Sequence, residues 1–104
     1  MKKINLAISG CLGRMGQQLI KSSRSNKNFK LVTLTENKVF NKKIAGIKLN
    51  LNTNEVFKNT DIIIDFTVPN CTLDILKIAS KLKKRVVIGT TGFSQKEEAL
   101  IKNF

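Results

Sequence analysis

The chain has 104 residues, enough for one small domain, and 41% of them are hydrophobic, with no apolar run near the roughly 18 residues of a membrane-spanning helix. The absence of histidine, with only two cysteines and no CxxC spacing, argues against a metal site and favours free thiols in a reducing compartment. The formal net charge of +12 favours an anionic partner, although the basic residues are scattered and no nucleic-acid-binding motif stands out.

The first predicted element is a strand over Ile4–Ile8, followed by a glycine-rich turn and a helix over Arg14–Arg24. This order is the context of a dinucleotide-binding fingerprint. Gly10 permits a tight turn out of the strand, Gly13 lets a pyrophosphate approach the backbone, and Gly16 lets the helix pack close against the sheet. The pyrophosphate would lie on free N–H groups at the positive end of the helix.

The same residues allow a second interpretation, because Ile8-Ser9-Gly10-Cys11 imitates the lipidation box of a secreted lipoprotein. The apolar run before it is short and Asn5 interrupts it, whereas a signal peptide needs roughly 7–15 apolar residues. The fingerprint is also imperfect, since Leu12 stands where its middle glycine would be. We favour the dinucleotide interpretation. For Cys11 we predict a filler position in the loop, the alternative being a thiol whose oxidation blocks the cofactor.

The second predicted strand covers Lys30–Thr35 and ends at Glu36, 20 residues after Gly16. An acid about twenty residues beyond the fingerprint is expected to hold the hydroxyls of the adenosine ribose. The alternative is an ordinary solvated loop acid. We therefore predict that Glu36 contacts the ribose of a bound dinucleotide.

The middle of the chain is less clear, with Ile44–Leu49 either a loop or a short edge strand and Asn54–Lys58 one helical turn. Beyond it, β-branched runs predict strands at Ile62–Ile64 and Val86–Ile88, with a helix over Pro69–Lys83 between them.

A last helix is expected to begin at Ser94, which opens a capping box with Glu97. Short, continuous apolar strands that alternate with helices are typical of a parallel sheet buried on both faces. The sequence therefore predicts an α/β fold with an open, doubly wound parallel sheet.

Small, hydroxyl-bearing or charged residues follow each of the four main predicted strands. In such sheets ligands bind beyond the carboxyl ends of the strands. The four exits together predict one crevice for a dinucleotide and a polar substrate. They are Gly10–Gly16, Glu36-Asn37-Lys38, Asp65-Phe66-Thr67-Val68-Pro69 and Gly89-Thr90-Thr91-Gly92-Phe93.

Three of these motifs closely resemble the 4-hydroxy-tetrahydrodipicolinate reductase family of bacterial lysine and diaminopimelate synthesis, also called dihydrodipicolinate reductases. They are Ser9-Gly10-x-x-Gly13-Arg14-Met15-Gly16, Asp65-Phe66-Thr67-x-Pro69 and Val87-Ile88-Gly89-Thr90-Thr91-Gly92-Phe93, in the family's order. The resemblance covers essentially the whole chain but only the family's amino-terminal, nucleotide-binding part. It implies a Rossmann-like domain over residues 1–104 and a cytoplasmic oxidoreductase that uses NADH or NADPH.

The resemblance also implies which residues touch the cofactor. The glycine loop would hold the pyrophosphate, Phe66 and Thr67 would lie along the cofactor, and Thr91 would also bind a carboxylate of the cyclic dicarboxylate substrate. The implied cofactor-binding residues are Gly10, Cys11, Leu12, Gly13, Arg14, Met15, Gly16, Glu36, Asn37, Lys38, Phe66, Thr67, Gly89 and Thr91.

The choice between the two coenzymes depends on the residues after the second strand. Glu36 favours the free 2′-hydroxyl of NADH and repels a 2′-phosphate, and Asn37 stands where relatives that take NADPH well place an arginine. Lys38 and Arg14 would accommodate the extra phosphate. We predict that NADH binds at least as well as NADPH.

The family's paired histidines, proton-donating lysine and Ser-Gly-Thr loop belong to an α+β substrate domain, and this sequence contains no histidine. We expect a truncated reductase that lacks that domain, has no catalytic residue of its own, and binds dinucleotide without turnover. An uncovered sheet edge and apolar face predict self-association. The alternatives are a non-catalytic nucleotide sensor and a basic nucleic-acid-binding protein; we expect neither a nucleic-acid nor a membrane partner.

Overall fold

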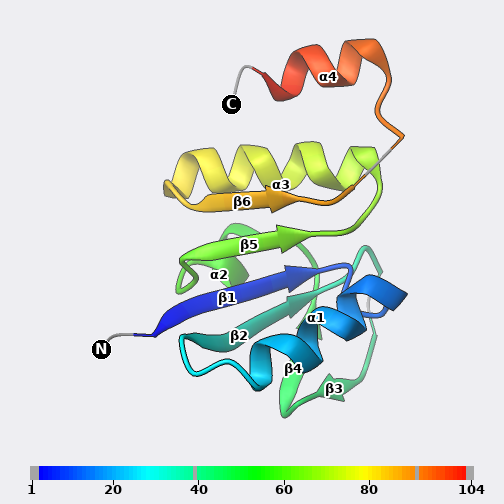
Figure 1. Cartoon of the computed structure of the whole chain (residues 1–104). Coiled ribbons are helices and arrows are strands. Elements are labelled where there is room, and N and C mark those ends of the chain that lie inside the picture. The colour runs from blue at the N-terminus through cyan, green and yellow to red at the C-terminus, as the bar shows by residue number, and fades with distance from the viewer. Residues whose placement is uncertain (1–2, 39, 91, 103–104) are drawn as a thin grey trace.

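The computed structural model describes residues 3–38, 40–90 and 92–102. Strands and helices alternate along most of the chain (Figure 1). The strands are β1 (Ile4–Ser9), β2 (Phe29–Thr35), β3 (Lys43–Ile44), β4 (Ile47–Asn50), β5 (Ile62–Asp65) and β6 (Arg85–Ile88). The helices are α1 (Arg14–Arg24), α2 (Asn54–Phe57), α3 (Pro69–Leu82) and α4 (Gln95–Ile101).

The strands form one sheet in the order β3-β4-β2-β1-β5-β6. All neighbours pair in parallel except β3 and β4, which form an antiparallel hairpin at one edge. The carboxyl ends of β1, β2, β5 and β6 therefore lie at the same edge of the sheet, as the arrowheads in Figure 1 show. The predicted fold class is confirmed.

Alternate residues of β1 face two separate cores, one on each side of the sheet. Leu6 and Ile8 pack with Ile20 of α1, whereas Ala7 packs with Ile63 of β5 and Ile75 of α3. A central strand buried on both faces explains why this run is almost wholly apolar. It also favours the strand interpretation over the lipoprotein one, since cleavage before Cys11 would remove the middle of the sheet.

The two open questions in the middle of the chain are answered by local geometry. Ala45 and Gly46 both have positive φ angles, 54° and 78°, and close the β3–β4 hairpin, so Ile44–Leu49 is an edge hairpin rather than a loop. The Thr53 hydroxyl accepts the Val56 N–H and caps the single turn of α2.

The ends of the two later helices also follow from their caps. α3 stops at Leu82 because Lys83 adopts the left-handed conformation, with φ 57°. α4 begins after Ser94, and both hydrogen bonds of the predicted capping box with Glu97 are present. Within the described residues, no helix has the length and apolar character needed to cross a bilayer.

Candidate functional site

The loop between β1 and α1 passes close to the backbone that follows β5. Gly10 has a φ of 83°, and a side chain there would overlap the carbonyl oxygen of Phe66. The Gly10 N–H donates to the Thr35 carbonyl at 3.0 Å, which ties the loop to the end of β2. The predicted tight turn at Gly10 is confirmed, and two independent constraints require glycine there.

Gly16 has a different role from the one expected. A Cβ atom at Gly16 would overlap the Gly10 carbonyl oxygen and lie 2.8 Å from the Cys11 Cα. The helix therefore packs closely on its own preceding loop, and the expected contact with the sheet is not the one that requires glycine. The close approach folds the loop back over the start of α1.

Gly13 has no such internal constraint. Its φ is −71°, and among the residues that the structure describes a Cβ atom there would meet only the Gly10 carbonyl oxygen, at 3.4 Å. It is the N-cap of α1 but provides no side-chain cap, and the first helical turn carries no acidic residue. The first N–H groups of α1 are therefore unshielded by a side chain and close to the positive charge of Arg14, a combination suited to an anionic group.

The Glu36 side chain, just after β2, hydrogen-bonds to the same loop. Its Oε2 accepts the Leu12 N–H at 2.8 Å, and its Oε1 accepts the Asn37 N–H at 3.3 Å. Each carboxylate oxygen retains a lone pair for a further donor. Sequence reasoning assigned Glu36 only to a ligand, and this contact with Leu12, 24 residues away, was not predicted.

Two adjoining hollows lie along this edge of the sheet, and both are bordered by Gly13, Phe66 and Thr67. We call them the β6-side hollow, of about 300 Å³, and the β2-side hollow, of about 200 Å³. The β6-side hollow is also lined by Arg14, Met15, Gly16, Gly89 and Thr90, and the β2-side hollow by Gly10, Glu36, Asn37 and Val68.

Ten of the fourteen residues expected to touch a cofactor therefore border one crevice. Among the described residues, Cys11, Leu12 and Lys38 line neither hollow. Thr91 lies outside the described residues, so its expected contacts with cofactor and substrate remain predictions. Val68 and Thr90 line the crevice but were not singled out; the only signal for them was their position in the strand-exit motifs.

Phe66 and Gly89 meet across the ends of β5 and β6. A Cβ atom at Gly89 would overlap the Phe66 ring, so the ring lies directly against the glycine backbone. This contact requires glycine after β6 and gives the β6-side hollow an aromatic wall. Pairing of Phe66 with Gly89 could not be read from the sequence, where 22 residues and a helix separate them.

A buried carboxylate, that of Asp65, lies next to the contact between Phe66 and Gly89. Asp65 ends β5 with none of its surface exposed, and the hydroxyls of Thr67, Thr72 and Thr90 all donate to it. Sequence reasoning placed Asp65 in a motif but gave it no role.

The Cys11 thiol is fully buried in the core on the α1 side of the sheet. Burial, reinforced by the negative charge of Glu36, raises the pKa of Cys11 to about 11. The interpretation of Cys11 as a filler residue agrees with this environment. Burial and the nearby Asp74 also raise the pKa of the Cys71 thiol.

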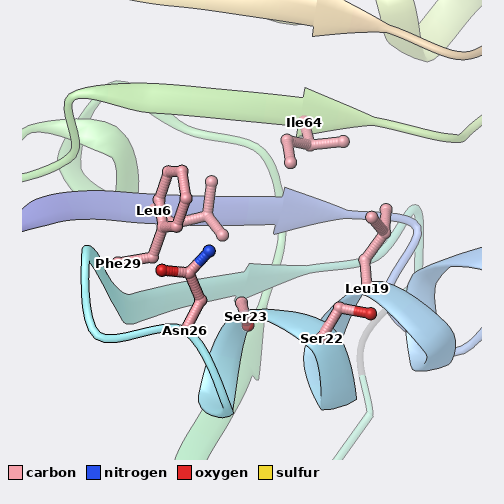
Figure 2. Close-up of a pocket in the computed structure, with 7 residues that line it drawn as sticks. All are labelled: Leu6, Leu19, Ser22, Ser23, Asn26, Phe29 and Ile64. Atoms are coloured by element: carbon pink, nitrogen blue, oxygen red, sulfur yellow. The ribbon is translucent and has the colours of Figure 1, made fainter.

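A further hollow, of about 150 Å³, lies between α1 and the sheet (Figure 2). Figure 2 shows Leu6, Leu19 and Ile64 beside it, with Asn26 from the loop after α1 and Phe29 from the start of β2. Its lining includes no charged residue. It is therefore unsuited to a phosphate-bearing ligand. We take the strand-end crevice as the candidate site because Arg14 and the start of α1 border it.

Comparison with known proteins agrees with this assignment. The family model for the N-terminus of dihydrodipicolinate reductase matches residues 4–104. The chain belongs to this family. Family membership confirms the resemblance found in the sequence and the expected cofactor class, NADH or NADPH, while the individual contact residues remain predictions.

Two curated relatives carry the name 4-hydroxy-tetrahydrodipicolinate reductase. The protein from Pelagibacter ubique is 85% identical over 104 residues, which are 100% of this chain and 40% of that protein. The protein from Buchnera aphidicola is 39% identical over 118 residues, covering 99% of this chain and 42% of the relative. The chain thus spans about two-fifths of the length of the relatives it matches.

A solved structure gives the same result at the level of the fold. Dipicolinate-bound dihydrodipicolinate reductase from Paenisporosarcina sp. TG-14 superimposes with a TM-score of 0.79 at 25% identity. The match covers 94% of this chain and 41% of that one. The family's Rossmann-like domain is therefore the part of the enzyme to which these residues correspond.

Proposed function

We propose that this chain binds NADH or NADPH across the strand-end crevice and supplies the coenzyme half of a dihydrodipicolinate reductase. The observation that carries the proposal is Gly13. No contact among the described residues requires glycine there, yet it caps a helix whose first N–H groups are unshielded and faces both hollows. A diphosphate placed over Gly13 would use that space and those donors.

The two hollows then divide the coenzyme between them. The β2-side hollow would take the adenosine half, with Glu36 accepting hydrogen bonds from the ribose through its remaining lone pairs. The β6-side hollow would take the nicotinamide half against Phe66 and Gly89. When bound, the coenzyme supplies the hydride, and the chain's own residues orient its ring and exclude water from one face.

The substrate we propose is the cyclic, unsaturated dicarboxylate of lysine and diaminopimelate synthesis, reduced in the cytoplasm. Hydride transfer needs an oriented substrate and a proton source, and among the described residues Glu36 is the one acid that lines the crevice. We therefore expect these 104 residues alone to bind coenzyme without steady turnover. We propose no nucleic-acid or membrane partner.

Titration of the chain with NADH and with NADPH tests the proposal. We expect both to bind, NADH at least as tightly, because the Glu36 carboxylate repels a 2′-phosphate. Glu36→Gln removes the charge and half of the acceptor capacity, so NADH affinity should fall about tenfold and NADPH affinity by less. Calorimetry or the change in nicotinamide fluorescence measures both constants.

Glu55→Gln is the matched control, since Glu55 is an exposed acid on α2 that borders neither hollow. It should leave both affinities unchanged. Absence of binding by either coenzyme would refute the proposed function. A strong preference of the unmodified chain for NADPH would refute only the role given to Glu36.

A further inference from the structure

Asp65 is a charged group that the proposed coenzyme contacts do not use. It is completely buried at the end of β5, and its hydrogen-bond partners among the described residues are hydroxyl groups rather than a lysine or arginine. Burying a carboxylate without a cation costs desolvation free energy. An apolar residue could fill the same space without that cost. A role other than stabilising the fold would account for its presence.

The three hydroxyls come from three different segments. Thr67 lies in the loop after β5 and donates to Oδ1 at 2.5 Å, and Thr90 follows β6 and donates to Oδ2 at 3.1 Å. Thr72 donates from the first turn of α3, whose positive end also favours the carboxylate. One side chain thus joins two of the segments that border the β6-side hollow, the loop after β5 and the loop after β6.

The carboxylate also fixes the direction of the Thr90 hydroxyl. Because that hydroxyl donates to Asp65, its lone pairs remain free for the Thr67 N–H, which donates to it at 2.9 Å. The Asp65 carbonyl meanwhile accepts the Gly89 N–H at 2.8 Å. Asp65 therefore fixes the position of the backbone after β5 relative to the backbone after β6.

We propose that Asp65 is a positioning residue for the nicotinamide half of the coenzyme. It does not touch the ligand. It acts through Thr67 and Thr90 to hold the wall formed by Phe66 and Gly89. This inference rests on the proposed function and goes beyond it, because it makes a buried acid outside the crevice responsible for the orientation of the reactive ring.

The glycine loop is held by the Thr35 carbonyl, and Glu36 by the Leu12 N–H. Phe66 and Thr67 border both hollows, but Gly89 and Thr90 border only the β6-side hollow. Loss of the Asp65 network should therefore affect the two halves of the coenzyme unequally. ADP-ribose carries the adenosine and diphosphate but no nicotinamide, so it reports on the half that Asp65 does not position.

The test compares the affinities of NADH and ADP-ribose for the unmodified chain and for Asp65→Asn. We expect the variant to bind NADH about tenfold more weakly and ADP-ribose within about a factor of two of the unmodified chain. Asp61→Asn is the matched control, because Asp61 stands just before the other end of β5, is exposed, and accepts the Asn5 N–H at 2.8 Å. It should leave the ratio of the two affinities unchanged.

A second pair of variants covers the case in which Asp65→Asn does not fold. Thr90→Val removes the hydroxyl that joins the loops and should show the same selective loss for NADH, whereas Thr90→Ser keeps the hydroxyl and should restore the ratio. Equal losses for both ligands would overturn the inference, and so would failure of both Asp65→Asn and Thr90→Val to fold. If the unmodified chain binds neither ligand, the proposed function itself fails.

Discussion

At the scale of single residues, the glycines of the first loop have distinct physical reasons for being glycine. Gly10 is required by its positive φ angle and by the Phe66 carbonyl, whereas Gly13 has room for a methyl group within the chain itself. Only the sequence spacing was needed to predict the turn. The roles of Gly10 and Gly13 can be distinguished only from the atoms around each residue. These atoms belong to Phe66, just after β5, and to the loop itself.

This difference predicts opposite results for two alanine variants. Gly10→Ala should lower the free energy of unfolding by about 2 kcal/mol or more, through backbone strain and overlap. Gly13→Ala should leave unfolding nearly unchanged but weaken NADH binding by about tenfold or more, since the methyl group would occupy the space of the diphosphate. Urea denaturation and calorimetry measure the two effects, and normal NADH binding by a folded Gly13→Ala would contradict the role of this position.

Cys11 gives a second prediction at this scale. Burial raises the pKa of this thiol to about 11, so the reactive thiolate is scarce at pH 8. In the Cys71→Ser variant, a disulfide-exchange reagent should modify Cys11 only as the chain unfolds in urea. The raised pKa means that the folded chain binds the thiol proton more tightly than the unfolded chain does. The stability that this difference contributes is therefore lost as the pH rises from about 9 to about 11. Rapid modification of the folded variant at pH 8 would contradict this account.

At the scale of secondary-structure elements, the sequence predicts the start of a helix well where a capping residue or a proline marks it. The capping box at Ser94 and the proline at the start of α3 were visible in the sequence and lie where they were expected. The β3–β4 hairpin stayed ambiguous because two-residue strands depend on pairing rather than on pattern. The buried role of Asp65 was not predictable, since its partners are spread over 25 residues.

α4 offers a test of how independently an element is stabilised. None of its described residues is buried, and the Ser94 hydroxyl accepts the Glu97 N–H at 3.1 Å. Ser94→Ala should therefore destabilise α4 locally by about 1 kcal/mol while leaving the global unfolding midpoint almost unchanged. Hydrogen exchange at the Glu98 and Lys102 amides should accelerate.

Thr53→Ala is the comparison variant, because Thr53 caps α2, which carries the fully buried Phe57. Loss of that cap should lower the stability of the whole domain. Equal effects of the two substitutions on the global midpoint would show that α4 is not an independent unit.

At the scale of the whole molecule, the two faces of the sheet are unequally covered. On the face that α1 covers, Val87 of β6 lies beside Ile64 of β5 in the parallel register, and Val87 is 55% exposed. Ile64 also borders the apolar hollow of Figure 2. Parallel sheets are normally covered on both faces, so we propose this strip as a site for contact with a second copy of the chain.

We therefore expect the chain to self-associate as its concentration rises, and Val87→Lys to shift it toward the monomer. Leu100→Lys is the control, because Leu100 is similarly exposed, at 45%, but lies on α4. Sedimentation velocity over a concentration series distinguishes the outcomes. A chain that stays monomeric throughout, or that responds equally to both substitutions, would contradict a role for the exposed strip.

The place of β1 in the sheet has a consequence for how the chain is made. β1 is synthesised before both of its sheet neighbours, yet one of its hydrogen-bonding edges is filled only by β5, where Leu6 lies beside Ile62. A nascent chain that has emerged only as far as β2 can form one side of the central pairing and not the other. The central pairing must therefore wait until β5 has left the ribosome, and β1 needs protection from stray partners during that interval.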